Sequence, residues 1–440
     1  MGHTLQIFSN IGWLVAGRVF QFLVSITVTV WLARYLGPQQ FGTLSFALAL
    51  VGILAVLPAL GLHNIVVRDV VASPGQAAEI LGSSMLVMAV AGIVTFGLLW
   101  LVVARILTDE MQTRVVVLTI GVSLVFSFTE VPRYWFESVV ESKYTVSVTS
   151  LVLLITSLVT VYLIYREATL KAFAWVMLAN SVAAGLLMVV VLRIRTGPLS
   201  RLRFNAQRAR ELLRDSWPLM LSGLAIMVYM KIDVLMLARM KGEHAAGIYG
   251  AATRISESWY FIPLFVVGSA FPAIIKARSS SPQQYRQRLQ ALYDALMLIA
   301  VSGAIVTTMV SDQIISVLFG EAYSSAGPVL SAHIWASVFV FLGVVSGRYL
   351  IAENRQVLNL QRNLAGALLN VALNYFVIPA YGPIGAAWTT VVSQAFAAFI
   401  FDVMQKETRQ MFRMKLLSMN IPKSIGRLRE HGLSLRQPST

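Results

Sequence analysis

Twelve apolar runs, each long enough to cross a bilayer, constrain this chain more than any other feature. A membrane-spanning helix needs roughly 20 predominantly apolar residues, and backbone exposed to lipid must satisfy its own hydrogen bonds. With 57% hydrophobic and only 12% charged residues, the chain lacks the polar surface of a water-soluble protein. The sequence therefore predicts an all-α polytopic membrane protein. The runs are 11–33, 41–62, 80–104, 115–136, 144–165, 172–192, 215–238, 246–272, 289–310, 328–351, 363–380 and 384–405.

The distribution of charge predicts the orientation of these spans. The chain has 35 Lys and Arg against 20 Asp and Glu, and cytoplasmic loops of membrane proteins carry the excess of Lys and Arg. With a cytoplasmic N-terminus, and with charges near the cytoplasmic span ends counted with the loops, cytoplasmic segments hold 23 basic and 11 acidic residues. External loops then hold seven basic and six acidic residues. We expect both termini in the cytoplasm, a retained first span and no nucleic-acid partner.

An internal repeat predicts two parallel lobes of six spans each. Leu32-Ala33-Arg34, Gly37, Gly42 and Ala47 recur 205 residues later as Leu237-Ala238-Arg239, Gly242, Gly247 and Ala252. Tyr162, Ala174 and Trp175 match Tyr375, Ala387 and Trp388 at an offset of 213. Parallel repeats that enclose a central substrate site are typical of transporters. We expect an N-terminal lobe at 1–192, a basic cytoplasmic linker at 193–214, a C-terminal lobe at 215–405 and a basic cytoplasmic tail at 406–440.

The expected tail mixes cations with apolar residues. Its cations are Lys406, Arg409, Arg413, Lys415, Lys423, Arg427, Arg429 and Arg436, and its apolar residues include Met411, Phe412, Met414, Leu416 and Leu417. A helix of this composition is typical of a segment that lies on anionic membrane lipids. Two other interpretations stay open: a topology anchor with no further role, and a docking site for a partner enzyme.

Eight charged residues of the predicted spans are candidates for a functional role. An intramembrane charge costs at least ~2.5–3.5 kcal/mol on insertion scales, so each needs a partner or a wet cavity. One interpretation is structural pairing, within Glu130–Arg133 and Arg254–Glu257 or between Asp233 and Arg254. Arg18 has no acid in its own span or the next, which favours an anionic ligand, whereas Arg348 lies near a helix end and can snorkel. The eight are Arg18, Arg133, Lys231, Arg254 and Arg348, with Glu130, Asp233 and Glu257.

Aromatic residues stand beside these charges: Tyr134 and Trp135 after Arg133, and Trp259 and Tyr260 after Glu257. Flat aromatic faces suit stacking on sugar rings, which makes these four candidates for sugar contacts. Trp and Tyr also line the membrane interface of any membrane protein, and that interpretation is favoured for Trp135.

Enzyme chemistry is not indicated by the sequence. The chain has no Cys, and its five His residues show no metal-ligand spacing. It contains no phosphate-binding loop and no zinc-protease motif, and the longest external loop, 311–327, is too short for a catalytic domain. We expect no cofactor, no metal site and no ATP hydrolysis.

Several segments resemble the Wzx-type polysaccharide flippases of the multidrug/oligosaccharidyl-lipid/polysaccharide (MOP) exporter superfamily. They include 31–47 (WLARYLGPQQFGTLSFA), 66–69 (VVRD), 246–254 (AGIYGAATR), 370–379 (NVALNYFVIP) and 381–387 (YGPIGAA), together with Gly61 and Lys231-Ile-Asp233. The resemblance covers nearly the whole chain, in the order and spacing of the family.

The resemblance implies a MATE-like fold that flips polyprenyl (undecaprenyl)-diphosphate-linked oligosaccharides from the inner to the outer leaflet of the bacterial plasma membrane by alternating access. It implies O-antigen or exopolysaccharide biosynthesis, with a polymerase and a chain-length regulator as partners. The five intramembrane cations would then bind the diphosphate, and one of the three acids would take a coupling proton. The alternative is a MATE-like cation-coupled exporter of small organic solutes, which Arg18 disfavours because such exporters often carry an Asp in span one. A scaffold role is the third interpretation.

Overall fold

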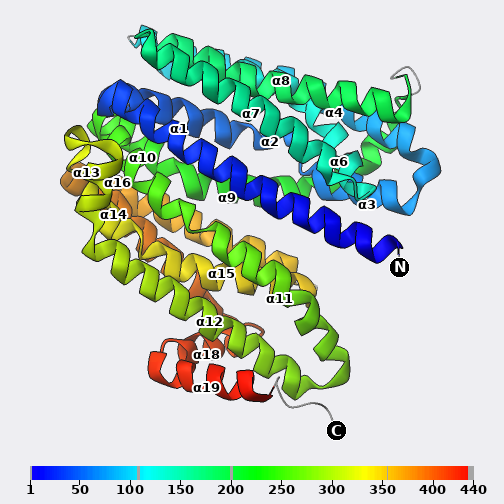
Figure 1. Cartoon of the computed structure of the whole chain (residues 1–440), viewed down its shortest axis with the longest axis vertical. Helices are drawn as coiled ribbons and strands as arrows, with labels where there is room; N and C mark the ends of the chain where they lie inside the picture. Colours follow the sequence, from blue (N-terminus) through cyan, green and yellow to red (C-terminus); the bar gives the residue numbers. More distant parts are fainter. Residues whose placement is uncertain (1, 107–109, 199–201, 354, 435–440) are drawn as a thin grey trace. The chain divides into compact units, whose positions relative to one another are not determined.

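The backbone of residues 2–106, 110–198, 202–353 and 355–434 is described by a computed structural model, and every regular element in these ranges is a helix (Figure 1). Ten segments of this part of the chain are long and apolar enough to cross a membrane. The predicted all-α membrane fold is therefore confirmed. Arg201 of the expected linker and Arg436 of the expected tail lie outside the described residues.

The ten segments are consistent with the twelve predicted spans, because two of them hold two runs each. Helix α1 (Gly2–Leu54) departs from helical geometry at Gly37, with φ 68° and ψ 171°, and Pro38 follows. Helix α16 (Gln356–Ala395) departs at Gly382, with φ 55° and ψ −137°, and Pro383 follows. A positive φ is favourable for glycine because it has no Cβ. The segments containing α1 and α16 span 57 and 49 residues.

The first compact unit is Met1–Leu235. Its long helices α4 (Ala77–Ile106), α7 (Ser142–Tyr165) and α8 (Leu170–Thr196) pack around α1, and α9 (Ala206–Lys241) begins in this unit (Figure 1). The fourth predicted span is α5 (Met111–Gly121), the 3₁₀ segment η2 (Val122–Glu130) and α6 (Val131–Ser138). Shorter helices are α2 (Val56–Ala59), α3 (Leu62–Ala72) and η1 (Pro74–Gln76). A core of α3, α4, α6 and α9 side chains holds their ends together.

The second unit is Met236–Thr440. Its core lies between α11 (Phe261–Ser280), α12 (Pro282–Met309) and α15 (Ala336–Ala352), with Tyr293 and Phe341 fully buried. Around this core lie α10 (Glu243–Ser258), α13 (Ser311–Phe319), η4 (Glu321–Tyr323), α14 (Ala326–His333) and α16. The π-helical turn η5 (Phe396–Ile400) leads into α17 (Phe401–Met404), and the tail forms α18 (Arg409–Ser418) and α19 (Ile421–Ser434) (Figure 1).

Repeat positions share backbone conformation and burial. Gly242 has φ 87° and ψ 169°, close to the values of its repeat partner Gly37. Tyr162 and Trp175 are 59% and 60% exposed, and Tyr375 and Trp388 are 63% and 50% exposed, while the alanines that precede both tryptophans are fully buried. These positions are consistent with the predicted repeat. The lobe boundaries expected at 192 and 215 stay predictions, since the compact units divide inside α9.

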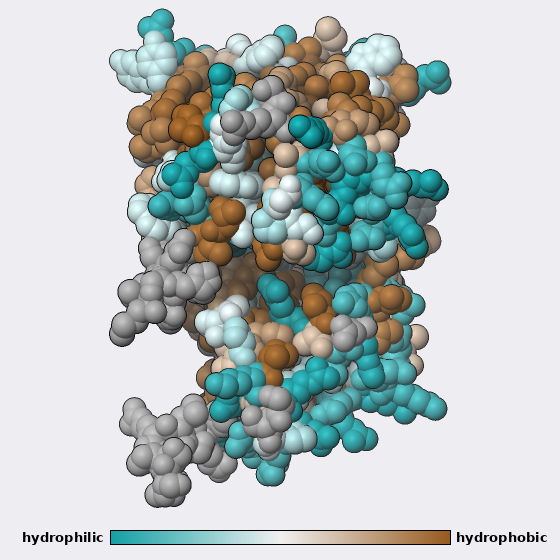
Figure 2. Space-filling model, turned by 90° about the vertical axis from the view of Figure 1, so that its right-hand side faces the viewer, coloured by the Kyte–Doolittle hydropathy of each residue, from teal (hydrophilic) through white to brown (hydrophobic). Residues whose placement is uncertain are grey.

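Large apolar side chains cover much of the outer surface. Val94 of α4 is 66% exposed, Leu158 of α7 is 62% exposed and Phe376 of α16 is 74% exposed. The face drawn in Figure 2 shows continuous areas of apolar side chains beside separate polar areas. Exposed apolar surface on this scale is unusual in water-soluble monomers, whereas a bilayer covers it.

Gly61 makes a close contact between two helices of the first unit. It has φ +67°, and an added methyl group would lie 2.6 Å from the backbone nitrogen of Met220 and 2.7 Å from the carbonyl of Ser216. Because both atoms belong to the α9 backbone, they cannot move aside cheaply. We expect Gly61→Ala to destabilise the protein by about 2–4 kcal/mol, from left-handed strain and overpacking.

Thermal unfolding in detergent measures this effect. Gly75→Ala is the matched control, because nothing lies within 4 Å of an added methyl group there and its φ is not positive. A Gly61→Ala protein that melts with the wild type would contradict the close contact.

Candidate functional site

Five ionisable side chains gather at one end of the first unit. His63 Nε2 of α3 lies 2.8 Å from Glu137 Oε2 of α6, and both side chains are about half exposed. Arg133 NH1 lies 3.5 Å from Glu130 Oε2. Arg18 of α1 and Arg133 both act electrostatically on Glu137. Arg18 and Arg133, two of the predicted cations, thus lie within electrostatic reach of one carboxylate.

Local sequence explains the position of this cluster. The 3₁₀ segment η2 ends at Glu130, and Pro132 stands in the first turn of α6, where its fixed φ suits a helix start. Arg133 and Glu137 are four residues apart on α6, so they share one face. The predicted pairing of Glu130 with Arg133 is confirmed.

Arg18 projects from a helix that is fixed one turn further on. Gln21 Nε2 donates to Thr149 Oγ1 at 2.8 Å and to Ser150 Oγ at 3.0 Å, both on α7. Gly17 lets α1 approach Val146 of the same helix so closely that a Cβ would clash. The backbone at Arg18 is therefore held in place, while its side chain stays exposed.

The other predicted cations are spread over three helices. Lys231 of α9 is half-buried, and Arg254 of α10 and Arg348 of α15 are exposed. Asp233 of α9 is 2% exposed and Glu257 of α10 is half-buried. Their grouping into one site with Arg18 and Arg133, and the pairings of Arg254 with Glu257 and Asp233, stay predictions.

The four predicted sugar contacts lie in packed surroundings. Tyr134 is 6% exposed, and its ring packs against His63 with centroids 4.9 Å apart. Trp135 is half-buried and meets Phe136 edge-on. Trp259 and Tyr260 pack against the core of the second unit, where a methyl group added at Gly303 would lie 2.8 Å from the Trp259 ring. Packing is their observed role, and sugar contact stays a prediction.

Sequence reasoning missed His63 and Glu137. Both fall in segments that we counted as loops, and they are 74 residues apart, so no local pattern connects them. The only available signal was the i,i+4 spacing of Glu137 with Arg133.

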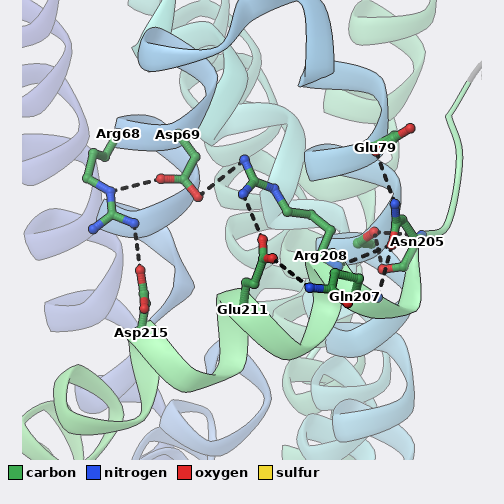
Figure 3. A network of polar contacts seen from close by, with 9 residues as sticks. Arg68, Asp69, Glu79, Asn205, Gln207, Arg208, Glu211 and Asp215 are labelled. Carbon is green, nitrogen blue, oxygen red and sulfur yellow. Dashed lines mark hydrogen bonds and ion pairs between the residues drawn. The ribbon is translucent and has the colours of Figure 1, made fainter.

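The start of α9 is tied to α3 and α4 by a polar network (Figure 3). Arg68 binds Asp69 and Asp215, each at 2.8 Å. Arg208 lies 3.7 Å from Asp69 and 3.1 Å from Glu211. The described part of the segment predicted as a basic linker is thus packed against its own unit.

Asn205 starts α9 and extends the same network (Figure 3). Its Oδ1 accepts from the backbone nitrogens of Gln207 at 2.9 Å and Arg208 at 3.2 Å, which is the preferred role of Asn at a helix start. Its side-chain nitrogen donates to Glu79 Oε2 at 3.3 Å. The side chains of this network bind one another and position α9. The cluster of Arg18, Arg133 and Glu137, whose side chains are partly exposed, is therefore the better candidate for ligand binding.

The second unit contains a buried polar cluster on α16. Asn374 donates to Asn370 Oδ1 at 3.2 Å, Thr389 donates to Asn374 Oδ1, and none of the three is more than 3% exposed. The side-chain nitrogen of Asn370 makes no hydrogen bond. Amide and hydroxyl oxygens are ligands that hard cations accept. Among the described residues, no group of three or more His, Cys, Asp or Glu is placed to hold a metal.

The chain matches two family models. Residues 7–278 match the family described as polysaccharide biosynthesis protein, and residues 218–376 match MatE. It is 26% identical over 251 residues to the probable flippase AglR of Haloferax volcanii, covering 56% of this chain and 52% of that protein. It is 20% identical over 406 residues to a putative O-antigen transporter of Shigella flexneri, covering 87% and 94%. The chain spans about half the length of the archaeal relative.

Two solved structures share the fold. Lipid II flippase MurJ in an inward closed conformation superposes with a TM-score of 0.75 at 13% identity, covering 93% of this chain and 91% of that chain. An inward-facing multidrug resistance MATE transporter of the MOP superfamily gives 0.67 at 13% identity, covering 91% and 96%. The predicted MATE-like fold is confirmed.

Proposed function

Because the chain belongs to the polysaccharide biosynthesis protein family, we propose that it is a flippase for polyprenyl-diphosphate-linked oligosaccharides. It moves them from the cytoplasmic to the outer leaflet of a bacterial plasma membrane, for O-antigen or exopolysaccharide biosynthesis. The observation that carries this proposal is that Arg18 and Arg133, both inside predicted spans, act electrostatically on the same carboxylate, that of Glu137.

Arginine suits the proposed cargo. A diphosphate brings about two negative charges, and hydrocarbon rejects ions strongly. Guanidinium groups bind phosphate oxygens in a planar, bidentate fashion and lose less hydration than ammonium groups. Arg18 and Arg133 therefore receive the diphosphate, and the polyprenyl chain stays in lipid.

The Glu130–Arg133 pair supplies a release step. At 3.5 Å, with both side chains about half exposed, this pair is weak, as are most solvated ion pairs. An arriving diphosphate replaces Glu130 as the partner of Arg133, and the pair forms again when the cargo leaves. Lys231, Arg254 and Arg348 hold the cargo at later stages of alternating access.

The membrane potential favours outward movement of the negatively charged diphosphate. Moving one charge across the membrane is worth ~2.3 kcal/mol per 100 mV, so two negative charges leaving an inside-negative cell gain about 4–5 kcal/mol per 100 mV. A coupling proton on Glu130, Asp233 or Glu257 adds to this driving force.

The chain is a multi-pass membrane protein. We place it in the bacterial inner membrane with both termini in the cytoplasm, where the excess of Lys and Arg belongs. The linked glycan is its cargo, and a polymerase and a chain-length regulator of the same pathway are its protein partners. Anionic lipids are a further partner, at the tail.

Deletion of the gene that encodes this chain tests the proposed flippase function. We expect surface polysaccharide to be lost and lipid-linked repeat units to accumulate facing the cytoplasm, with both restored by a plasmid copy. A drug-susceptibility panel on the same strain tests the alternative exporter. Normal polysaccharide together with raised sensitivity to organic cations would reject the flippase in favour of that exporter.

A further inference from the structure

Helix α18 is fastened to the second unit by a buried ion pair. Lys415 Nζ lies 2.6 Å from Asp402 Oδ2 of α17, and the two side chains are 0% and 1% exposed. Lys415 also donates to the carbonyl of Ala398. A Lys is almost never fully buried unless it is paired, so the contact fixes how α18 is rotated against the unit.

Helix α19 is fastened by a second buried carboxylate. Arg427 donates through Nε to Asp294 Oδ2 at 2.7 Å and through NH2 to Oδ1 at 2.8 Å. Ser424 Oγ donates to the same carboxylate at 3.1 Å. Asp294 of α12 is fully buried. The bidentate geometry restricts both position and orientation of α19.

These contacts divide α18 into two faces. Met411, Met414, Lys415 and Ser418 are buried against the unit, whereas Arg409, Arg413, Leu416 and Leu417 are exposed. At about 100° per residue, the exposed four fall within a third of the helix circumference. Of the apolar residues of the tail, Met411 and Met414 therefore face the unit, whereas Leu416 and Leu417 face outward.

We propose that the outer face of α18, formed by Arg409, Arg413, Leu416 and Leu417, is a docking surface for anionic membrane lipids. Leu416 and Leu417 are each 52% exposed, and apolar side chains flanked by cations are typical of helices that lie in the membrane interface. Helix α18 begins five residues after α17 ends. Since α17 completes a predicted span, its short connection keeps α18 close to the bilayer surface.

Charge complementarity and fixed orientation support lipid as the occupant. Each Lys or Arg near an anionic leaflet contributes attraction, and the two leucines add apolar contact with the acyl boundary. Because the buried ion pairs already hold α18 in place, docking does not require the helix to fold or turn. A soluble acidic protein would use the arginines but leave the leucines in water.

A nitroxide label on the outer face tests this proposal in the full chain. The protein has no Cys, so Leu416→Cys gives a unique labelling site, and Gln313→Cys on exposed α13 is the control. The labelled proteins are placed in nanodiscs of phosphatidylcholine alone or with phosphatidylglycerol. Collision with oxygen reports lipid exposure, and collision with a water-soluble nickel chelate reports water exposure.

We expect the Leu416→Cys label to favour oxygen over nickel more strongly in phosphatidylglycerol discs than in phosphatidylcholine discs, while the Gln313→Cys label favours nickel in both. An equal preference of the Leu416→Cys label in the two discs would contradict the part of the proposal that concerns anionic lipids. Arg409→Gln with Arg413→Gln should lower the docked-to-undocked ratio roughly thirtyfold. Neither residue takes part in the two buried ion pairs, so the fold should persist, as unfolding temperature verifies. A Leu416→Cys label exposed to water in both discs would overturn lipid docking in favour of a soluble partner. The proposal rests on the anionic-lipid partner of the proposed function, and because transport is not measured, its failure is distinguishable from failure of the flippase assignment.

Discussion

Lys415→Ala is expected to destabilise the second unit by about 3–5 kcal/mol. The substitution leaves the Asp402 carboxylate 1% exposed without its closest cation. Burial lowers the pKa of Lys415 to about 8, and Asp402 acts in the opposite direction. The amine therefore stays largely protonated at neutral pH, and the loss is that of an ion pair.

Thermal unfolding in detergent, followed together with limited proteolysis of the tail, measures this loss. Lys423→Ala is the matched control, because Lys423 is exposed and such substitutions usually change stability by less than about 0.5 kcal/mol. The double variant Lys415→Met, Asp402→Leu should recover most of the stability, since apolar residues of similar volume often replace a buried pair without cost. Equal instability of the double and single variants would contradict the buried pair as the cause.

Arg18→Ala is expected to abolish or strongly reduce surface polysaccharide while the amount of protein in the membrane stays unchanged. The side chain is exposed and its helix is held by Gln21 and Gly17 instead, so the fold does not depend on it. A charged hydrogen bond contributes about 1.5–3 kcal/mol, which corresponds to a ten- to hundredfold weaker interaction with a diphosphate.

Complementation of the deletion strain measures this effect. Arg18→Lys should retain part of the activity, because the charge remains while the planar contact is lost. Arg210→Ala is the control, since Arg210 is an exposed cation outside the cluster and should behave as wild type. Full activity of Arg18→Ala would reject Arg18 as a diphosphate ligand and leave the family assignment untouched.

Local composition was sufficient to predict the spans. A run such as 144–165 holds no charged residue and is bounded by Lys143 and Arg166, and α7 covers Ser142–Tyr165. Gly37 and Gly382 mark the breaks inside the two longest helices. Such features need only neighbouring residues, because a helix in lipid satisfies its backbone internally.

Contacts between distant residues could not be predicted in the same way. Asp294 and Asp402 lie near span ends, so we counted them with the cytoplasmic charges, yet both are fully buried. Their partners are 133 and 13 residues further along, on tail helices whose packing no periodicity reveals. Within the candidate site, helical spacing accounts for the Glu130–Arg133 pair and for the shared face of Arg133 and Glu137 on α6, but not for the approach of His63 or Arg18.

The buried ion pairs Asp294–Arg427 and Asp402–Lys415 also affect when the second unit folds during synthesis. Asp294 is synthesised long before Arg427, and Asp402 before Lys415, so both carboxylates enter the nascent bundle without these cations. An unpaired buried charge is strongly destabilising, so the second unit reaches its full stability only after α18 and α19 have been translated. A product truncated before Arg427 therefore keeps the buried Asp294 carboxylate without its cation and is less stable. Proteins of lowered stability are more readily degraded by cellular proteases.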